Sequence, residues 1–199
     1  MILKFADLAI CLSKAREISA KYASAVNGQV TFPKSIDVLV DVCKAYLPRE
    51  IVIKDMWPEA GSANDSIRSF CLNMHGQPFE ICLLSGLNYC WRRYCVCFEL
   101  FHAILEQPAA NTTSIYSHIQ DVLDAFPDAS AMGTPATRNE ALAEFGVMEF
   151  LFPYSEREKL ALPLTEPSSI AEQYKVPQVL VERYTGEQYM DALKGLVNV

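Results

Sequence analysis

The chain has 199 residues and a mass of 22.3 kDa, which suits one domain or one domain with a small appendage. Apolar residues make up 51% and charged residues 21%, a composition that excludes intrinsic disorder. The formal net charge of −7, from 17 basic and 24 acidic residues, excludes binding of nucleic acid through an overall positive charge. No apolar run approaches the ~18–20 residues of a membrane span, so we expect no membrane partner.

The charge is distributed unevenly along the chain. Residues 1–54 hold eight basic and five acidic residues, whereas 55–199 hold nine and 19. The first segment could face an acidic partner. The interpretation we prefer is that its basic residues lie on the solvated faces of two helices.

Seven cysteines are an odd number without a paired framework. Cys95 and Cys97 form a Cys-x-Cys sequence, which is not a usual zinc spacing. We expect buried free thiols in a reducing compartment and therefore a cytoplasmic location.

Hydrophobic periodicity predicts two helices at the start of the chain. The first covers 2–26, and Asn27-Gly28 closes it in the manner of a C-cap and turn. The second covers about 34–46, with Ser35 as a possible N-cap. Three strands follow, which we expect to form an antiparallel meander: 50–57, 66–74 and 79–84.

A long helix over about 91–106 comes next and is apolar on nearly every side, which indicates a buried central helix. Four more helices are predicted after it, over 114–126, 138–152, 169–174 and 177–184. We interpret 1–199 as one domain with four parts: N-terminal helices (1–48), a sheet (50–85), the central helix with an insertion and a later helix (91–153), and a C-terminal helical tail (154–199).

Two polar residues stand on one face of the central helix. Glu99 and His102 are three positions apart, so they project from the same side. Burying either residue without a partner costs about 1–3 kcal/mol, so their presence needs an explanation. In His-Glu-x-x-His helices, two imidazoles hold zinc and the Glu acts as general base. Here Phe98 stands in place of the first His.

The chain resembles the ImmA/IrrE family of zinc metallopeptidases, in the same order over most of its length. Arg92-Arg93-Tyr94 leads into the motif helix, a later helix runs from Glu140 to Pro153, and 170–181 resembles the closing segment of the family. The resemblance implies an α+β fold with a zincin-like core: a small antiparallel sheet, a buried motif helix and surrounding helices. It also implies that His102 and Glu140 are zinc ligands and that Glu99 is the general base.

Several positions depart from the family pattern. Phe98 replaces the first zinc ligand, and Phe101 replaces the usual Gly, adding bulk beside the expected cleft. On the later helix, Glu144 and Gly146 replace the usual Asn or Asp and Phe. The stretch 109–137 before that helix is interpreted as an insertion, because the spacing is longer than the family pattern.

Another residue could restore the missing ligand. Cys97 lies roughly 140° around the helix from His102 and points away, and Cys95 lies two turns, about 10 Å, before it. His75 and His118 lie outside the motif helix, and a loop could bring either one in.

The remaining set of Glu99, His102 and Glu140 could hold a metal weakly, because Glu-x-x-His with a second Glu is half of a carboxylate-bridged iron site. We prefer a degenerate site in which Glu99 and His102 hydrogen-bond or ion-pair inside a cleft. Phe98 would fill the position of the zinc, so we expect no cofactor or weakly bound zinc.

Family members typically act on helix-turn-helix repressors in bacterial stress responses or mobile elements. The resemblance therefore implies a protein partner such as a helix-turn-helix repressor or an antitoxin. Our first hypothesis is a pseudo-peptidase, inactive or weak, which binds such a partner. The alternatives are an active zinc endopeptidase with a non-standard ligand and a metal-free interaction domain.

Two further patterns favour packing roles. The segment Ile170–Tyr184 could pass for a helix-turn-helix, but its few basic residues indicate a packing element, so we expect no direct contact with nucleic acid. Four aromatic residues could line a peptide groove, although we prefer core positions for them: Trp57, Tyr89, Trp91 and Tyr94.

Overall fold

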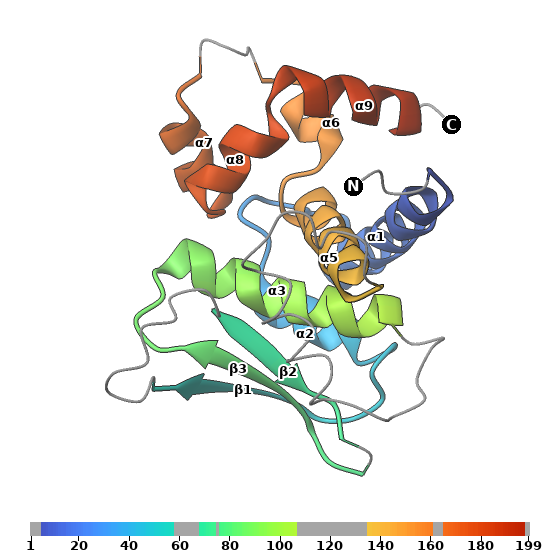
Figure 1. Cartoon of the computed structure of the whole chain (residues 1–199), viewed down its shortest axis with the longest axis vertical. Helices are drawn as coiled ribbons and strands as arrows, with labels where there is room; N and C mark the ends of the chain where they lie inside the picture. The colour runs from blue at the N-terminus through green and yellow to red at the C-terminus, as the bar shows by residue number, and fades with distance from the viewer. Residues whose placement is uncertain (1–4, 58–67, 75, 107–134, 161–164, 198–199) are drawn as a thin grey trace.

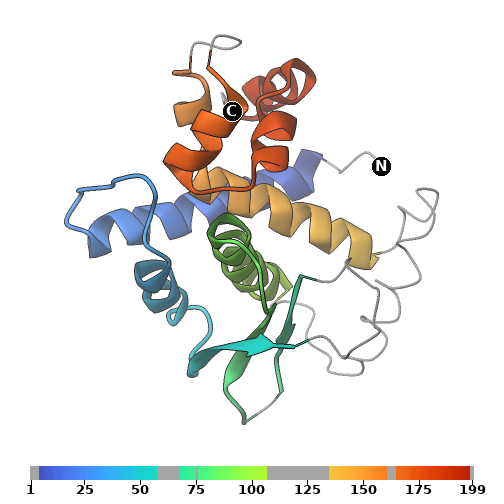
Figure 2. The same ribbon diagram turned by 90° about the vertical axis from the view of Figure 1, so that its left-hand side faces the viewer.

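The computed structural model describes residues 5–57, 68–74, 76–106, 135–160 and 165–197. The elements, in chain order, are α1 (Phe5–Ala25), α2 (Ile36–Cys43), β1 (Ile51–Met56), β2 (Ser69–Leu72), β3 (Phe79–Leu84), α3 (Tyr89–Glu106), α5 (Pro135–Leu151), α6 (Tyr154–Arg157), α7 (Pro167–Tyr174), α8 (Gln178–Tyr184) and α9 (Glu187–Val197). The fold is α+β. The sheet lies at one end, α3 covers it, α5 packs on α3, α1 packs on α5, and the C-terminal helices lie at the other end (Figure 1, Figure 2).

Both N-terminal helices form where the sequence predicts them. α1 ends before Asn27 and Gly28, whose φ angles are 52° and 77°, and the Gly28 N–H donates to the Ala23 carbonyl at 2.7 Å. A glycine tolerates this left-handed turn because it has no Cβ. The Ser35 hydroxyl accepts a hydrogen bond from the Val38 N–H and caps α2, as predicted.

The three strands form a mixed sheet, so the prediction of an antiparallel meander is wrong. Their order is β1-β3-β2, in which β1 runs parallel to β3 and β2 runs antiparallel to it. β3 takes the centre because it is the strand with the most buried side chains: Phe79, Ile81 and Leu83 are fully buried. β1 exposes Ile53 and Lys54, which suits an edge strand.

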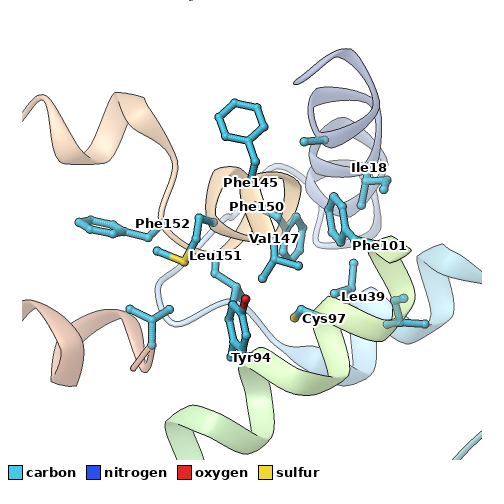
Figure 3. Packing of buried hydrophobic residues seen from close by; sticks show 14 of the residues in the cluster. Ile18, Leu39, Tyr94, Cys97, Phe101, Phe145, Val147, Phe150, Leu151 and Phe152 are labelled. Carbon is cyan, nitrogen blue, oxygen red and sulfur yellow. The ribbon is translucent and has the colours of Figure 1, made fainter. Parts of the chain in front are cut away.

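α3 is the central helix of the molecule, as its all-round apolar sequence predicts. It packs on the sheet with one side and on α5 with the other. Figure 3 shows Tyr94, Cys97 and Phe101 of α3 gathered with Val147 and Phe150 of α5 in the core. α1 closes this core through its own contacts with α5.

Phe101 does not lie beside a cleft, contrary to the sequence-based expectation. Its side chain is fully buried against Gly146 of α5. A Cβ atom at position 146 would lie 2.7 Å from Cδ1 of Phe101 and 3.1 Å from Sγ of Cys11, closer than packed atoms tolerate. The bulk of Phe101 therefore requires a residue without a side chain opposite it.

The C-terminal part contains two helices that were not predicted, α6 and α9. α7 and α8, and α5 before them, match the expected helices with small shifts at their ends. Arg157 of α6 is fully buried and holds this part together: it pairs with the Glu149 carboxylate on α5, and its Nη1 donates to the Tyr184 carbonyl on α8 at 3.2 Å.

Lys34 contradicts the interpretation that the basic residues of 1–54 all lie on solvated helix faces. Its side chain is buried, and its Nζ donates to the Phe150 carbonyl at 2.5 Å near the end of α5. The nitrogen also lies 4.2 Å from the centre of the Phe150 ring. Burial lowers the pKa of Lys34 to about 8. An ammonium at this place interacts favourably with the negative end of the α5 dipole.

The expectation of free thiols is confirmed, because all seven cysteines lie in the described part of the chain and none forms a disulfide. Among the described helices, none has the length and apolar character needed to cross a membrane. The helix expected over 114–126 lies outside the described residues.

Candidate functional site

A stripe of aromatic rings runs along α3 and ends at His102. The rings of Trp91, Tyr94, Phe98 and His102 follow one another, with centroids 5.7, 5.8 and 6.1 Å apart. Residues three or four positions apart share a helix face, which explains the stripe. Phe98 is half-buried and stands one turn before His102, where a His-Glu-x-x-His helix carries its first imidazole.

His102 meets Glu140 across the interface between α3 and α5. Nε2 of His102 lies 3.1 Å from Oε1 of Glu140, and their side chains are 13% and 37% exposed. About 37 residues separate the two in sequence, so only the packing of α3 on α5 brings them together. The two side chains form an ion pair when the imidazole is protonated.

Glu99 is buried beside this pair and is held by the sheet. Its Oε1 accepts a hydrogen bond from Oγ of Ser69 on β2 at 2.6 Å, and its side chain is 5% exposed. Burial raises the pKa of Glu99. The Ser69 hydroxyl, the charge of His102 and a hydrogen bond from Cys71 lower it, while the charge of Glu140 raises it. The structure thus brings Glu99, His102 and Glu140 into one electrostatic neighbourhood.

Among the described residues, no three side chains are arranged to hold a zinc ion. In the part of the chain that the structure describes, no group of three or more His, Cys, Asp or Glu side chains could hold a metal ion. His102 and Glu140 contact each other, and Oε1 of Glu99 accepts a hydrogen bond from Ser69. The side chain of Phe98 contains only carbon and hydrogen and so has no atom that binds zinc. A catalytic zinc site needs three protein ligands and a water.

The alternative ligands considered from the sequence do not complete the set within the described residues. Cys97 is fully buried, and Cys43 of α2 is among its electrostatic neighbours, so it faces away from Glu140. Burial raises the pKa of Cys95 to about 11, which disfavours the thiolate that binds metals. His75 and His118 lie outside the described residues, so their roles stay untested.

Glu144, one turn after Glu140, has a structural role that sequence analysis missed. Its Oε1 accepts hydrogen bonds from Nη1 of Arg183 at 2.7 Å and from the Tyr184 hydroxyl at 3.1 Å. Burial raises the pKa of Tyr94 well above its ordinary value, and the charge of Glu144 adds to this effect. The second carboxylate of α5 therefore attaches α8. The four-residue spacing between Glu140 and Glu144, which places both carboxylates on one face of the helix, was the sequence signal for this role.

The four aromatic residues expected in the core differ in their burial. Tyr94 is buried, as preferred. Trp57 and Tyr89 are 83% and 60% exposed, so the core interpretation is wrong for them. Trp91 is half-buried, and the Arg68 guanidinium lies 4.0 Å from the centre of its ring. Trp91 also lines an open depression of about 400 Å³ between the start of α3 and the α7–α8 pair.

The helix-turn-helix-like segment packs inward. α7 and α8 contact each other and bury the following side chains: Ile170, Ala171, Tyr174, Leu180, Val181 and Tyr184. This arrangement agrees with a packing element. The expectation that the segment does not bind nucleic acid stays a prediction.

The sequence matches no protein-family model, and a search of curated proteins finds no similar sequence. The resemblance to the ImmA/IrrE family therefore depends on the residues and motifs of this chain alone.

Proposed function

We propose that this chain is a degenerate ImmA/IrrE-like metallopeptidase with a zincin-like core, a pseudo-peptidase that binds a protein partner and is inactive or weakly active. The observation that carries the proposal is the 3.1 Å contact between His102 and Glu140. The resemblance assigns the second and third zinc ligands to these two positions. Their contact is a tertiary feature that no local pattern in the sequence requires.

The proposed loss of activity depends on Phe98. The phenyl ring stands next to His102, with its centroid 6.1 Å from that of the imidazole, and it cannot donate an electron pair to a metal. Glu99 keeps the position of the general base. Burial raises its pKa, whereas the hydrogen bond from the Ser69 hydroxyl lowers the pKa and occupies Oε1, one of the two oxygens that could accept a proton from water.

A second observation supports the resemblance. Phe101 and Gly146 both depart from the family pattern, which has a small residue at the first position and a large one at the second. In this protein the two residues touch, and the bulk gained on α3 matches the bulk lost on α5. Exchanges that conserve volume at contacting core positions preserve a fold, whereas either change alone is costly.

The charge of the chain suits the proposed class of partner. Residues 55–199 hold nine basic and 19 acidic residues. Helix-turn-helix proteins bind DNA through basic surfaces, so an acidic chain offers complementary charge to a helix-turn-helix repressor or antitoxin. Under this proposal zinc is absent or weakly bound and is not needed for recognition of the partner.

The substitution Phe98→His tests the assignment of the site. It places a second imidazole one helical turn before His102, which together with Glu140 would supply three ligands. We expect about one zinc per chain by elemental analysis. At a zinc concentration about 100-fold above its Kd, we expect roughly 2.7 kcal/mol of added stability and a rise in Tm of about 5–10 °C.

Two control variants isolate the metal effect. Phe98→Gln removes the ring without adding an imidazole, and Phe98→His combined with Glu140→Gln removes the third ligand. Neither should gain stability from zinc. If Phe98→His shows no zinc-dependent shift in Tm, the metal-free interaction domain replaces the proposal. If the unmodified protein holds one zinc tightly, the active endopeptidase with a non-standard ligand replaces it.

A further inference from the structure

β1 and the residues that flank it form a sequence that is complementary to itself in antiparallel pairing. The stretch 49–55 is Arg-Glu-Ile-Val-Ile-Lys-Asp. When two copies are placed antiparallel about Val52, every residue meets one of opposite charge or of the same apolar type: Arg49 with Asp55, Glu50 with Lys54, and Ile51 with Ile53. Cross-strand pairs of opposite charge and of β-branched residues stabilise a sheet.

β1 also has backbone groups directed away from its sheet. In the described part of the chain β1 pairs with β3 alone. The carbonyls of Glu50 and Met56 accept hydrogen bonds from Phe79 and Ser85, each at 2.8 Å, so the even-numbered residues point their backbone groups toward β3. Because these groups alternate in direction along a strand, those of Ile51, Ile53 and Asp55 point toward the outer edge.

We propose that this edge pairs with the same edge of a second copy of the chain, related by a two-fold axis through Val52. The strand order of the homodimer is β2-β3-β1-β1-β3-β2. Ile51 of each copy exchanges backbone hydrogen bonds with Ile53 of the other, as the outward direction of their groups requires. Val52 faces itself in a pair without hydrogen bonds, where side chains approach most closely.

The register follows from two requirements. A two-fold axis perpendicular to the sheet makes each face of one copy continuous with the same face of the other copy. Paired residues must therefore lie on the same face of β1. Centring the pairing on Ile53 places Val52 against Lys54, and centring it on Lys54 places two lysines opposite each other, which is unfavourable. Only the register about Val52 matches charges and apolar residues together.

The side chains on the outer face of the sheet are arranged to accept the second copy. Nζ of Lys54 lies 2.7 Å from Oε1 of Glu80 on β3, and 51% of the Lys54 side chain remains exposed. In the homodimer Lys54 lies between its own Glu80 and Glu50 of the second copy. The contact involves a short strand and buries less than the ~1,200 Å² of standard stable interfaces, so we expect a Kd on the order of 10–100 µM.

Sedimentation velocity of the full chain, from about 1 to about 500 µM, tests the proposal around that Kd. Lys54→Glu places two pairs of glutamates in register, and Glu50→Lys places two pairs of lysines. Each variant alone should dimerise about tenfold or more weakly than the unmodified chain. An equimolar mixture of the two variants restores both charge pairs and should dimerise at least as tightly as the unmodified chain.

Ile53→Pro is an independent variant, because it removes an N–H that points outward and leaves the hydrogen bonds between β1 and β3 in place. It should keep the Tm and lose the dimer, and it keeps the test decisive if a charge variant fails to fold. A chain that stays monomeric through about 500 µM overturns the proposal, since it excludes the expected Kd. Charge variants that dimerise as tightly as the unmodified chain, or a mixture that gains nothing, also overturn it.

Discussion

Two buried carboxylates in this protein are held in opposite ways. Glu149 on α5 is 7% exposed and Glu99 on α3 is 5% exposed. Glu149 pairs with the guanidinium of buried Arg157 and accepts a second hydrogen bond from the Tyr154 N–H at 3.2 Å. Glu99 has the neutral hydroxyl of Ser69 as its closest partner, at 2.6 Å.

This difference distinguishes the region around Glu149, which has a structural role, from the region around Glu99, which belongs to the candidate functional site. A buried carboxylate with a buried cation keeps its charge and joins the elements that supply the pair, here α5 and α6. A buried carboxylate held by neutral donors has its pKa raised by burial, as for Glu99, and such groups occur preferentially at functional sites. Glu149 therefore anchors the C-terminal helices, whereas Glu99 belongs to the candidate site.

The largest expected effect comes from breaking the structural pair. Arg157→Met leaves the Glu149 carboxylate buried without a cation, so we expect the free energy of unfolding to fall by about 3–5 kcal/mol. Urea denaturation at neutral pH measures this loss. The double variant Glu149→Leu with Arg157→Met removes both charges and should lose less. A double variant as unstable as Arg157→Met would show that packing of the arginine, and not its charge, holds this region.

A smaller effect is expected at the partner of Glu99. Ser69→Ala removes the 2.6 Å hydrogen bond, which should lower the free energy of unfolding by about 1–2 kcal/mol at neutral pH. It should also raise the pKa of Glu99 further, because the Ser69 hydroxyl lowers that pKa. Combining it with Glu99→Leu, which removes the acceptor, in a double-mutant cycle by urea denaturation isolates the pair. An unchanged loss in the Glu99→Leu background would exclude the hydrogen bond as its cause.

The smallest effect at neutral pH, within about 1 kcal/mol, is expected for Glu99→Gln, because an amide keeps the hydrogen bond and removes the buried charge. Its pH dependence is diagnostic. Burial raises the pKa of Glu99 in the folded state above the ordinary 4.5, so the folded state holds the proton more tightly than the unfolded state does. The stability from this group is complete below pH 4.5 and is lost as the pH rises through the folded pKa.

Urea denaturation of both proteins between about pH 4 and pH 8 measures this prediction as a difference. The free energy of unfolding of the unmodified chain, relative to that of Glu99→Gln, should fall as the pH rises. A difference that increases with pH would mean that Glu99 is stabilised as a charged group, as Glu149 is, and the distinction between the two regions would fail.

Much of the local structure was predictable from the sequence. The caps at Ser35 and Asn27-Gly28, the alternation in the three strands and the apolar surface of α3 are patterns among neighbouring residues. α6 has only four residues, too few to show a helical period, and it is held by the distant partners of Arg157. α9 carries apolar residues at helical spacing, a signal that was overlooked: Tyr189, Met190 and Leu193.

The candidate site was predictable only in part. That Glu99 and His102 share a face follows from the 3.6-residue period of a helix. Glu140 was reached through a family resemblance, because no spacing rule connects residues so far apart. Their meeting depends on the close packing of α3 on α5, which the absence of a side chain at Gly146 permits beside Phe101.

The sequence alone therefore determines most of the described helices and strands, though not α6, and which side chains share a helix face, because those properties depend on residues within one or two turns. Only the tertiary structure decided the strand order, the burial of Lys34 and the different partners of Glu99 and Glu149. Each of these is a contact between distant parts of the chain. Its free energy depends on how the whole core excludes water and satisfies its buried polar groups.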